Sequence, residues 1–385
     1  MHFGRCGGCS LLTTPIAEQL RRKADRVQGL LARHLGAVQV EYEVPLLTPR
    51  RDRTRILYPI QPDRRRRLTM GIYARGSHDV VEIQECMIQE RALTLLGKRV
   101  LAILRDQALE PYDEATGKGF VRAFSARIAP GTGELLLGLV TTAGAVPQPE
   151  ALISQLRAAA HGLRDQQGRV LEPVGIVRNQ NDAPGNALLG RESETLWGRD
   201  HLIDRAAGLT FQISFASFAQ SHRDAEAVLY APAFALLGPI DGLRIVDGYG
   251  GGGAFGLRAA RYGARSVVIR ESSPSACRDA AANIAANALP QVQVSEGPFA
   301  TYEPEGATDL LIVDPPRAGL MADGAAAALR IGAPQLLHVA CSAEALARDL
   351  DRLGAGGYRV GRCRLADLFP HTEHVEVLTL LQKEV

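Results

Sequence analysis

The chain has 385 residues, of which 46% are hydrophobic and 22% charged, and its formal net charge is +2. This length predicts two or three domains, and the composition excludes a disordered or fibrous protein. No stretch approaches the roughly 20 apolar residues of a membrane span, and six cysteines are too few for a disulfide scaffold. We therefore expect a cytoplasmic protein with no membrane association and no obligate protein partner.

The first half of the chain predicts a β-rich α+β domain over residues 1–205. A helical segment lies within residues 12–40, where it can pack on the C-terminal domain, and a second helix is predicted at 88–109. Apolar runs separated by turn residues predict strands at 53–60, 68–74, 79–85, 120–129 and 134–142. A polar connection follows around residues 178–190.

From about residue 218 the chain alternates helices with strands. Strands are predicted at 243–249, 266–271, 292–296, 309–314 and 335–341, and helices at 223–237, 255–262, 272–289 and 343–350. Strands that alternate with helices of this length form βαβ units, which build a parallel, doubly wound sheet. The sequence therefore predicts an α/β protein with a Rossmann-like domain over residues 206–385.

A glycine-rich turn follows the first strand of this domain. Asp247 and Tyr249 end the strand, and the glycines at 250–253 and Ala254 lead into a helix. Such a turn lets a cofactor approach the backbone at the carboxyl edge of a parallel sheet. Glu271 ends the next strand, where a carboxylate can accept both ribose hydroxyls. The pattern favours a nucleotide or S-adenosylmethionine (SAM) over a ligand-free loop, and its spacing also permits NAD.

Three cysteines in the first half form a candidate metal site. Cys6 and Cys9 make a C-x-x-C motif around two glycines, and Cys86 follows the predicted strand at 79–85. This spacing suits Zn²⁺, a [4Fe–4S] cluster or redox chemistry. A pair of free thiols is the alternative interpretation.

Three further residues are candidates for chemistry in the second half. Cys341 follows a strand and precedes a helix, so we expect a lowered thiol pKa and a nucleophile, against the alternative of a small buried apolar residue. Asp314 ends the strand at 309–314 and should lie at the same edge. Glu376 precedes an apolar alternation, as a partly buried general base would. The spacing of His371 and His374 also permits a metal site, but the sequence offers no third ligand for it.

Together, these segments resemble the RNA uracil-5-methyltransferase family, the SAM-dependent enzymes that make 5-methyluridine in ribosomal and transfer RNA. FGRCGGCS resembles the family's iron–sulfur motif, SFAQ a SAM-contacting segment, and DGYGGGGAFG the SAM loop. DPPRAG is intact, ACSAEALARD resembles the nucleophile motif, and FPHTEHVE resembles the motif with the general base. The resemblance covers nearly the whole chain and keeps the order of the motifs, but it includes no N-terminal TRAM domain.

The resemblance implies a reaction and a set of ligands. Cys341 would add to uracil C6, and Glu376 would remove the C5 proton after methyl transfer. The implied SAM contacts are Gln220, Tyr249, Ala254, Glu271 and Asp314, and the implied ligands of a [4Fe–4S] cluster are Cys6, Cys9 and Cys86. The expected substrate is a splayed uridine in RNA, first of all 23S rRNA, because relatives with the cluster motif often modify it. Arginines in the runs 50–55 and 64–67 are candidates to hold phosphates.

The chain departs from the family pattern at several positions. The first cluster cysteine would fall one residue before Met1, which implies a cluster with three protein ligands or a different start, with His2 as a weak substitute. Other departures are His222, Gly250, Pro298 and Ser342. The alternatives are therefore a tRNA T-loop uridine methyltransferase, a catalytically silent RNA-binding relative, and an NAD-dependent oxidoreductase.

Overall fold

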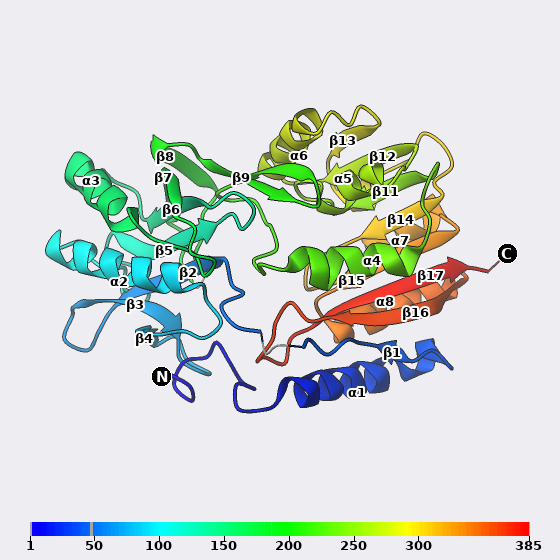
Figure 1. The fold of residues 1–385 in the computed structure, drawn as a ribbon, viewed down its shortest axis with the longest axis horizontal. Coiled ribbons are helices and arrows are strands. Elements are labelled where there is room, and N and C mark those ends of the chain that lie inside the picture. The colour runs from blue at the N-terminus through cyan, green and yellow to red at the C-terminus, as the bar shows by residue number, and fades with distance from the viewer. Residues whose placement is uncertain (1, 47–48, 186, 385) are drawn as a thin grey trace.

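Two sheets, each covered by its own helices, make up the protein (Figure 1). The structure is a computed structural model that describes residues 2–46, 49–185 and 187–384. Between the two sheets lies a two-stranded hairpin, β9 (His201–Ala206) and β10 (Leu209–Ser214). Within the described ranges, no helix is long and apolar enough to cross a membrane.

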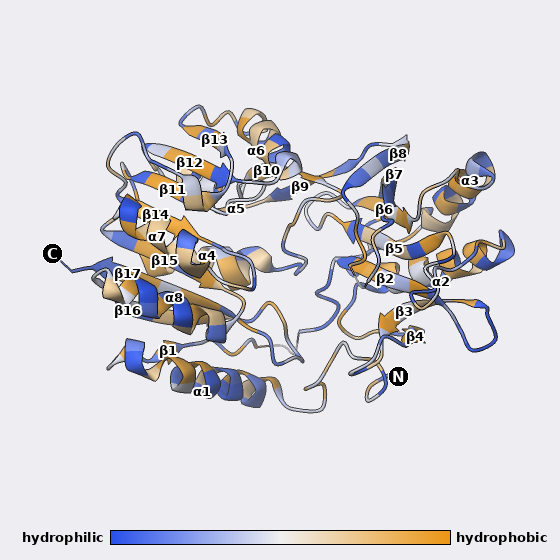
Figure 2. Ribbon diagram, turned by 180° about the vertical axis from the view of Figure 1, so that it is seen from behind, coloured by the Kyte–Doolittle hydropathy of each residue, from blue (hydrophilic) through white to orange (hydrophobic). Residues whose placement is uncertain are grey.

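The C-terminal sheet has eight strands in the order β1-β16-β17-β15-β14-β11-β12-β13. These are β1 (Val40–Glu41), β11 (Arg244–Gly248), β12 (Ser266–Glu271), β13 (Val292–Glu296), β14 (Leu310–Val313), β15 (Gln335–Ala340), β16 (Tyr358–Ala366) and β17 (Glu376–Lys383). All pairings are parallel except those of β17, which runs antiparallel to β15 and β16. The central strand β14 is apolar along its length, and β15 is apolar except for Gln335 and His338 (Figure 2), as burial on both faces favours.

Helices cover both faces of this sheet and enclose two separate cores. One core includes η1 (Glu226–Tyr230), α4 (Ala231–Leu237), α5 (Ala254–Arg261) and α6 (Pro274–Ala286). The other includes α1 (Ile16–Leu35), α7 (Met321–Ile331) and α8 (Ala343–Ala355). A short 3₁₀ turn, η2 (Phe299–Thr301), follows β13. This arrangement confirms the predicted doubly wound α/β domain.

The N-terminal sheet has seven strands in the order β4-β3-β2-β5-β6-β7-β8. These are β2 (Arg55–Pro62), β3 (Leu68–Tyr73), β4 (Val80–Glu82), β5 (Val121–Ile128), β6 (Glu134–Thr141), β7 (Glu172–Gln180) and β8 (Glu192–Gly198). Its core is shared with α2 (Arg91–Asp106) and α3 (Pro149–Ala160). Neighbouring strands are antiparallel except β6 and β7, because α3 connects them as a crossover.

The segment that contains α1 and β1 packs on the C-terminal half, although it precedes the N-terminal sheet in the chain. α1 contacts α8, and β1 extends the large sheet by pairing Val40 with Cys363. Lys23 of α1 is almost fully buried, and its Nζ lies 2.7 Å from Asp367 Oδ1. The buried ion pair fixes α1 beside the loop that leads into β17.

The polar part of the N-terminal half differs from the sequence-based expectation. The sequence predicts only a polar connection around residues 178–190, which lies mostly between β7 and β8, and it misses β7, β8, α3 and the β9–β10 hairpin. Most of β8 is exposed on both faces, so its residues show no apolar alternation. In β7, the buried Asn179 donates its side-chain N–H groups to the Gly190 and Glu192 carbonyls. Side-chain hydrogen bonds thus stabilise strands that hydropathy does not reveal.

Candidate active site

The glycine loop between β11 and α5 is held by Asp247. This residue is fully buried, and its Oδ2 accepts a 2.7 Å hydrogen bond from the Gly256 N–H. Gly251 and Gly253 have positive φ angles of 55° and 89°, which glycine adopts without strain. A Cβ on Gly250 would lie 2.7 Å from Ile269 Cγ2. A side chain at Gly250 would therefore require the Ile269 and Asp247 side chains to move.

Glu271 contacts the same loop from the end of β12. Its Oε2 accepts a hydrogen bond from the Gly251 N–H at 3.0 Å, and Oε1 accepts from the N–H groups of Ser272 and Ser273 at 2.7 Å. Carboxylate oxygens accept more than one hydrogen bond, so these contacts leave acceptor capacity for a ligand. Glu271 thus connects the loop to the N-terminus of α6.

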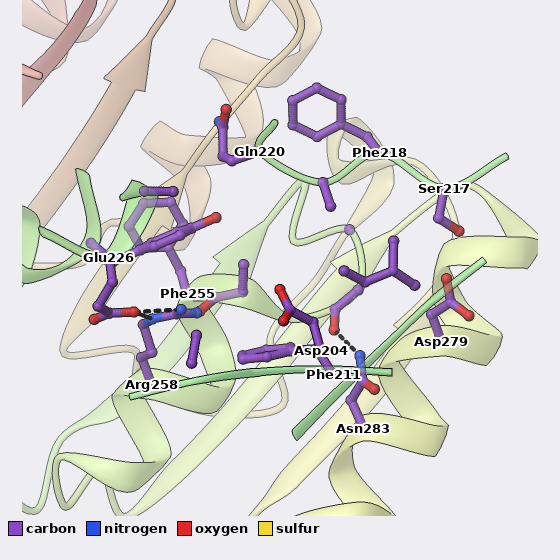
Figure 3. A pocket seen from close by; sticks show the side chains of 18 of the residues that line it. Asp204, Phe211, Ser217, Phe218, Gln220, Glu226, Phe255, Arg258, Asp279 and Asn283 are labelled. Carbon is purple, nitrogen blue, oxygen red and sulfur yellow. Dashed lines mark hydrogen bonds and ion pairs between the residues drawn. The ribbon is translucent and has the colours of Figure 1, made fainter. Parts of the chain in front are cut away.

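A cavity opens beside this loop (Figure 3). Four of the five residues expected to contact SAM line it, namely Gln220, Tyr249, Ala254 and Asp314. Phe218 and Gln220 lie on one strand-like segment above the cavity, and Phe211, Phe255 and Arg258 lie on the opposite side. Phe218 is 71% exposed, whereas the loop residues below it are largely covered. The structure thus brings the predicted SAM residues together around one concave site.

The cavity also contains a buried ion pair that the sequence analysis missed. Arg258 is 3% exposed, and its Nε and Nη2 donate to Glu226 Oε2 at 2.8 and 2.6 Å. Its Nη1 donates to the Ala254 carbonyl at 2.6 Å, and the guanidinium lies 3.9 Å from the Tyr230 ring centroid. Arg258 therefore holds the start of α5 against η1. The sequence signal that could have revealed this ion pair is an arginine inside the apolar run of a short helix.

Asp314, Cys341 and Glu376 meet at the carboxyl edge of the large sheet. Asp314 follows β14 directly, Cys341 follows β15, and Glu376 is the first residue of β17. Ala340 of β15 pairs with Val377 of the antiparallel β17, so the next residues at this end, Cys341 and Glu376, lie opposite each other. The topology thus brings together two residues that are 35 positions apart in the chain.

Burial changes the proton affinity of these groups. Glu376 is 4% exposed, its Oε2 has no hydrogen-bond partner within the described part of the chain, and burial followed by repulsion from Asp314 raises its pKa to about 8. Burial raises the pKa of Asp314 to about 7. The pKa of Cys341 is also raised, first by burial and then by Glu376 and Asp314. The predicted lowering of this thiol pKa is therefore wrong, because burial and the two carboxyls outweigh the helix N-terminus.

Two nearby residues position this edge, and the sequence analysis assigned neither a structural role. Ser342 is the N-cap of α8, where its Oγ accepts the Ala345 N–H at 3.2 Å and donates to Glu344 Oε2 at 3.0 Å. Asp349 of α8 is buried, accepts the Leu320 N–H at 2.8 Å and lies 3.1 Å from His338 Nε2. Asp349 thus fixes the turn that follows Asp314, and the departure at Ser342 preserves a helix cap.

The three candidate metal ligands lie in the N-terminal half, away from this edge. Cys6, Cys9 and Cys86 line one cavity together with His2. Within the described residues, no group of three or more His, Cys, Asp or Glu side chains has an arrangement that could hold a metal ion. Burial, followed by repulsion from Cys86 and Cys6, raises the pKa of Cys9 to about 12. His2 Nε2 accepts the Gln84 N–H at 2.9 Å, so this nitrogen already has a protein partner.

The histidines near the C-terminus have structural contacts. His371 is buried, its Nδ1 lies 3.3 Å from Gln19 Nε2, and its Nε2 lies 3.0 Å from the Pro49 carbonyl. Both ring nitrogens are thus engaged by α1 and the chain that follows β1. The metal site left open for His371 and His374 has no support in this geometry.

The two arginine runs differ in exposure. Arg53 and Arg55 are mostly buried, and Arg53 donates to the Leu368 carbonyl at 2.6 Å and lies over the Phe369 ring. Arg53 thus connects the two halves, whereas Arg50 of the same run is exposed, and phosphate binding by this run stays a prediction. The run 64–67, in contrast, is fully exposed at the turn between β2 and β3.

Comparisons with known proteins place the chain in a family. The family model described as tRNA (Uracil-5-)-methyltransferase matches residues 305–384, a range that includes Asp314, Cys341 and Glu376. An uncharacterized RNA methyltransferase of Listeria innocua is 31% identical over 386 residues, covering 98% of this chain and 82% of the relative. An uncharacterized RNA methyltransferase of Halalkalibacterium halodurans is 30% identical over 387 residues, which cover 99% of this chain and 82% of the relative.

A solved structure agrees with these relatives. The tRNA (uracil-54, C5)-methyltransferase of Pyrococcus abyssi, in complex with S-adenosyl-L-homocysteine (SAH), superposes with a TM-score of 0.76 at 25% identity, covering 97% of this chain and 85% of that one. The chain belongs to the RNA uracil-5-methyltransferase family. It is a SAM-dependent RNA methyltransferase, and the NAD-dependent alternative has no support among these proteins.

Proposed function

We propose that the protein forms 5-methyluridine in RNA, with 23S rRNA as the first candidate substrate. The observation that carries this proposal is the meeting of Cys341, Glu376 and Asp314 at one sheet edge, beside the cavity lined by the glycine loop. A nucleophile and a buried carboxyl on facing strands are what methylation at an unreactive ring carbon requires.

The steps follow from the chemistry of the ring. The Cys341 thiol loses its proton to water, and the thiolate sulfur bonds to C6 of uracil, which moves the C5–C6 electron pair onto the C4 oxygen as an enolate. SAM, when bound, would supply the methyl group: C5 would bond to the methyl carbon while the bond from that carbon to the SAM sulfur breaks, which restores the C4 carbonyl and leaves SAH. Glu376 takes the proton from C5, the enolate reforms, and elimination breaks the S–C6 bond and releases Cys341.

The raised pKa of Glu376 suits the proton-abstraction step. A carboxylate whose conjugate acid has a pKa of about 8 is a stronger base than an exposed glutamate, because burial destabilises its charge. Gln220, Tyr249, Ala254, Glu271 and Asp314 are proposed to surround the methyl donor, and Asp314 also faces the target base.

A tRNA uridine is the second candidate substrate. The family description and the Pyrococcus abyssi neighbour both name tRNA uracil methylation, and this neighbour spans nearly the whole chain. The N-terminal half, including the exposed arginines at 64–67, is proposed to contact the RNA backbone. Six free cysteines agree with action in a reducing cytoplasm.

Cys6, Cys9 and Cys86 are proposed to hold a [4Fe–4S] cluster with three protein ligands. All three line one cavity, and thiolates are the usual ligands of iron–sulfur clusters, but in the described residues their arrangement does not form a metal-holding group, so the proposal requires them to move closer together. Anaerobically purified protein should then contain about four iron and four sulfide per chain, and Cys86→Ser should lower both. Stoichiometric zinc, or no metal under these conditions, would contradict the cluster.

Trapping with 5-fluorouridine tests the reaction. Total RNA that contains 5-fluorouridine is incubated with the protein and SAM and is then separated by denaturing electrophoresis. Because fluorine cannot leave C5 as a proton, the enzyme should remain covalently joined to its substrate. We expect a SAM-dependent shifted band that is absent with Cys341→Ala, and sequencing of the trapped RNA distinguishes rRNA from tRNA. SAM binding without any band would favour the catalytically silent relative.

A further inference from the structure

Residues 217–223 form one wall of the SAM cavity, yet the N-terminal half holds them in place. Phe218 and Gln220 lie over the cavity in this segment (Figure 3). At one end, the Ser217 carbonyl accepts a 3.2 Å hydrogen bond from Arg127 of β5. At the other end, the Ser221 carbonyl accepts from Thr54, from its N–H at 2.9 Å and its Oγ1 at 3.1 Å. Both ends of the wall are therefore anchored outside the methyltransferase sheet.

His222 and Asp52 form the buried centre of this anchor. Their side chains are 4% and 3% exposed, and His222 Nε2 lies 3.2 Å from Asp52 Oδ2. His222 Nδ1 accepts the Asp224 N–H at 3.1 Å, which leaves the hydrogen of a neutral ring on Nε2. Neither carboxylate oxygen of Asp52 has a hydrogen-bond partner among the described residues, so the two side chains are in close contact without a hydrogen bond. The main chain is bonded at the same place, because the Arg223 N–H donates to the Asp52 carbonyl at 2.7 Å.

Asp52 is itself fixed by the neighbouring loop. The N–H groups of Arg51 and Arg53 donate to the carbonyls of Met87 and Ile88, each at 2.8 Å. The Glu90 N–H returns a 2.9 Å hydrogen bond to the Arg53 carbonyl. Asp52 thus lies in a short ladder of three chain segments, and His222 connects that ladder to the residue two positions after Gln220.

We propose that His222 and Asp52 are positioning residues that hold Gln220 over the SAM cavity and so set the affinity for the methyl donor. Gln220 and the buried His222 both line the cavity, and Thr54 holds the carbonyl of Ser221 between them. The inference rests on the proposed use of SAM but is independent of which RNA is methylated.

Calorimetric titration with SAH and steady-state kinetics test this role. His222→Ala should weaken SAH binding about tenfold, the size expected for losing one buried hydrogen-bonding contact, and should raise KM for SAM more than it lowers kcat. His222→Asn, whose side-chain oxygen can accept the Asp224 N–H in place of Nδ1, should restore affinity to within about threefold. The control is Tyr358→Phe, which removes a buried 2.7 Å hydrogen bond to the Ala333 carbonyl at the far side of the sheet.

The outcomes separate a positioning role from a structural one. Tyr358→Phe should lower the melting temperature while it leaves SAH binding unchanged. Unchanged SAH binding in His222→Ala, or a His222→Asn variant no better than alanine, would overturn the inference. A wild-type protein that binds SAH normally but methylates no RNA would contradict the proposed function and leave the affinity comparison valid.

Discussion

Buried ionisable groups occur in two regions: the sheet edge with Asp314, Cys341 and Glu376, called the catalytic edge, and the joint between the two halves, where residues 51–54, 87–90 and 221–223 meet. Of these two regions, as far as the structure describes them, only the joint has a basic side chain beside a buried carboxyl. At the edge, Asp247, Asp314 and Glu376 have no ion-pair partner among the described residues, and burial raises the pKa of each. The joint contains the ion pair Glu90–Arg223 and the close contact of Asp52 with His222. Burial also raises the pKa of Glu90, but Arg223 opposes that rise, so the two regions place similar carboxyl groups in different electrostatic settings.

The difference has a functional meaning. An unpaired buried carboxyl reduces stability when it ionises, so it persists where a proton must be held or moved. A paired carboxyl in the same degree of burial fixes the geometry of the groups around it. We therefore expect substitutions at the edge to change chemistry, and substitutions at the joint to change stability and ligand affinity.

Replacing the nucleophile should give the largest effect. Cys341→Ala should lower methyl transfer at least about 1000-fold, because no other group can form the bond to C6. SAH affinity should stay within twofold of wild type, since Cys341 does not line the cavity beside the glycine loop. Methyl incorporation from labelled SAM measures the first quantity and calorimetry the second. Full turnover in this variant would exclude the addition–elimination mechanism.

Neutralising Glu376 should stop turnover after the methyl transfer. Glu376→Gln cannot accept the C5 proton, so this variant should accumulate a covalent complex with RNA that contains ordinary uridine and no 5-fluorouridine. The complex is seen as a shifted band on a denaturing gel. A variant that releases methylated RNA at the wild-type rate would show that another group is the base. Cys341→Ala provides the control, because it should form no adduct.

The same substitution should change stability with a definite sign. The folded-state pKa of about 8 exceeds the ordinary 4.5, so the stability contributed by protonated Glu376 is complete below about pH 4.5 and is lost as pH rises through 8. Glu376→Gln should therefore be more stable than wild type by about 4 kcal/mol at pH 8 and by less than about 1 kcal/mol at pH 5. Denaturant melts at the two pH values measure this, and equal differences would contradict the raised pKa.

Breaking an ion pair at the joint should lower the stability of the protein, in contrast to Glu376→Gln, which should raise it. Glu90 and Arg223 have side chains that are 0% and 6% exposed, so Glu90→Gln leaves a buried guanidinium without its partner. The expected loss of stability is about 3 kcal/mol. Asp309→Asn, which breaks the exposed pair with Arg244, should cost less than about 1 kcal/mol. Similar losses in the two variants would mean that the joint gains nothing from its buried charges.

The smallest expected effect is on ligand affinity as a function of pH. Asp314 lines the cavity with a pKa of about 7, and SAM carries a positive sulfonium that favours the ionised carboxyl, whereas SAH does not. Between pH 6 and pH 8, SAM affinity should rise up to about tenfold and SAH affinity much less. Parallel titrations with the two ligands measure the ratio. A constant ratio would place the charge of SAM away from Asp314.

Much of the C-terminal half could be predicted from the chain. Its apolar strands, glycine turn and ordered motifs depend on local pattern, so the doubly wound fold, the edge position of Asp314 and the approach of Cys341 to Glu376 were accessible. The N-terminal half was harder. β7 and β8 contain polar residues whose burial or exposure depends on partners far away in the chain, and α3 lies between them.

The sequence by itself determined the family and the order of the motifs, because each depends on residues that are close together in the chain, and through the resemblance it predicted the reacting groups. Only the tertiary structure decided the burial of the site carboxyls, the surroundings of His222 and the burial of Arg53. Those properties come from groups that the chain brings together over long separations, such as Glu376 beside Asp314 and His222 beside Asp52. Burial and charge at such contacts are set by three-dimensional packing, which local patterns do not contain.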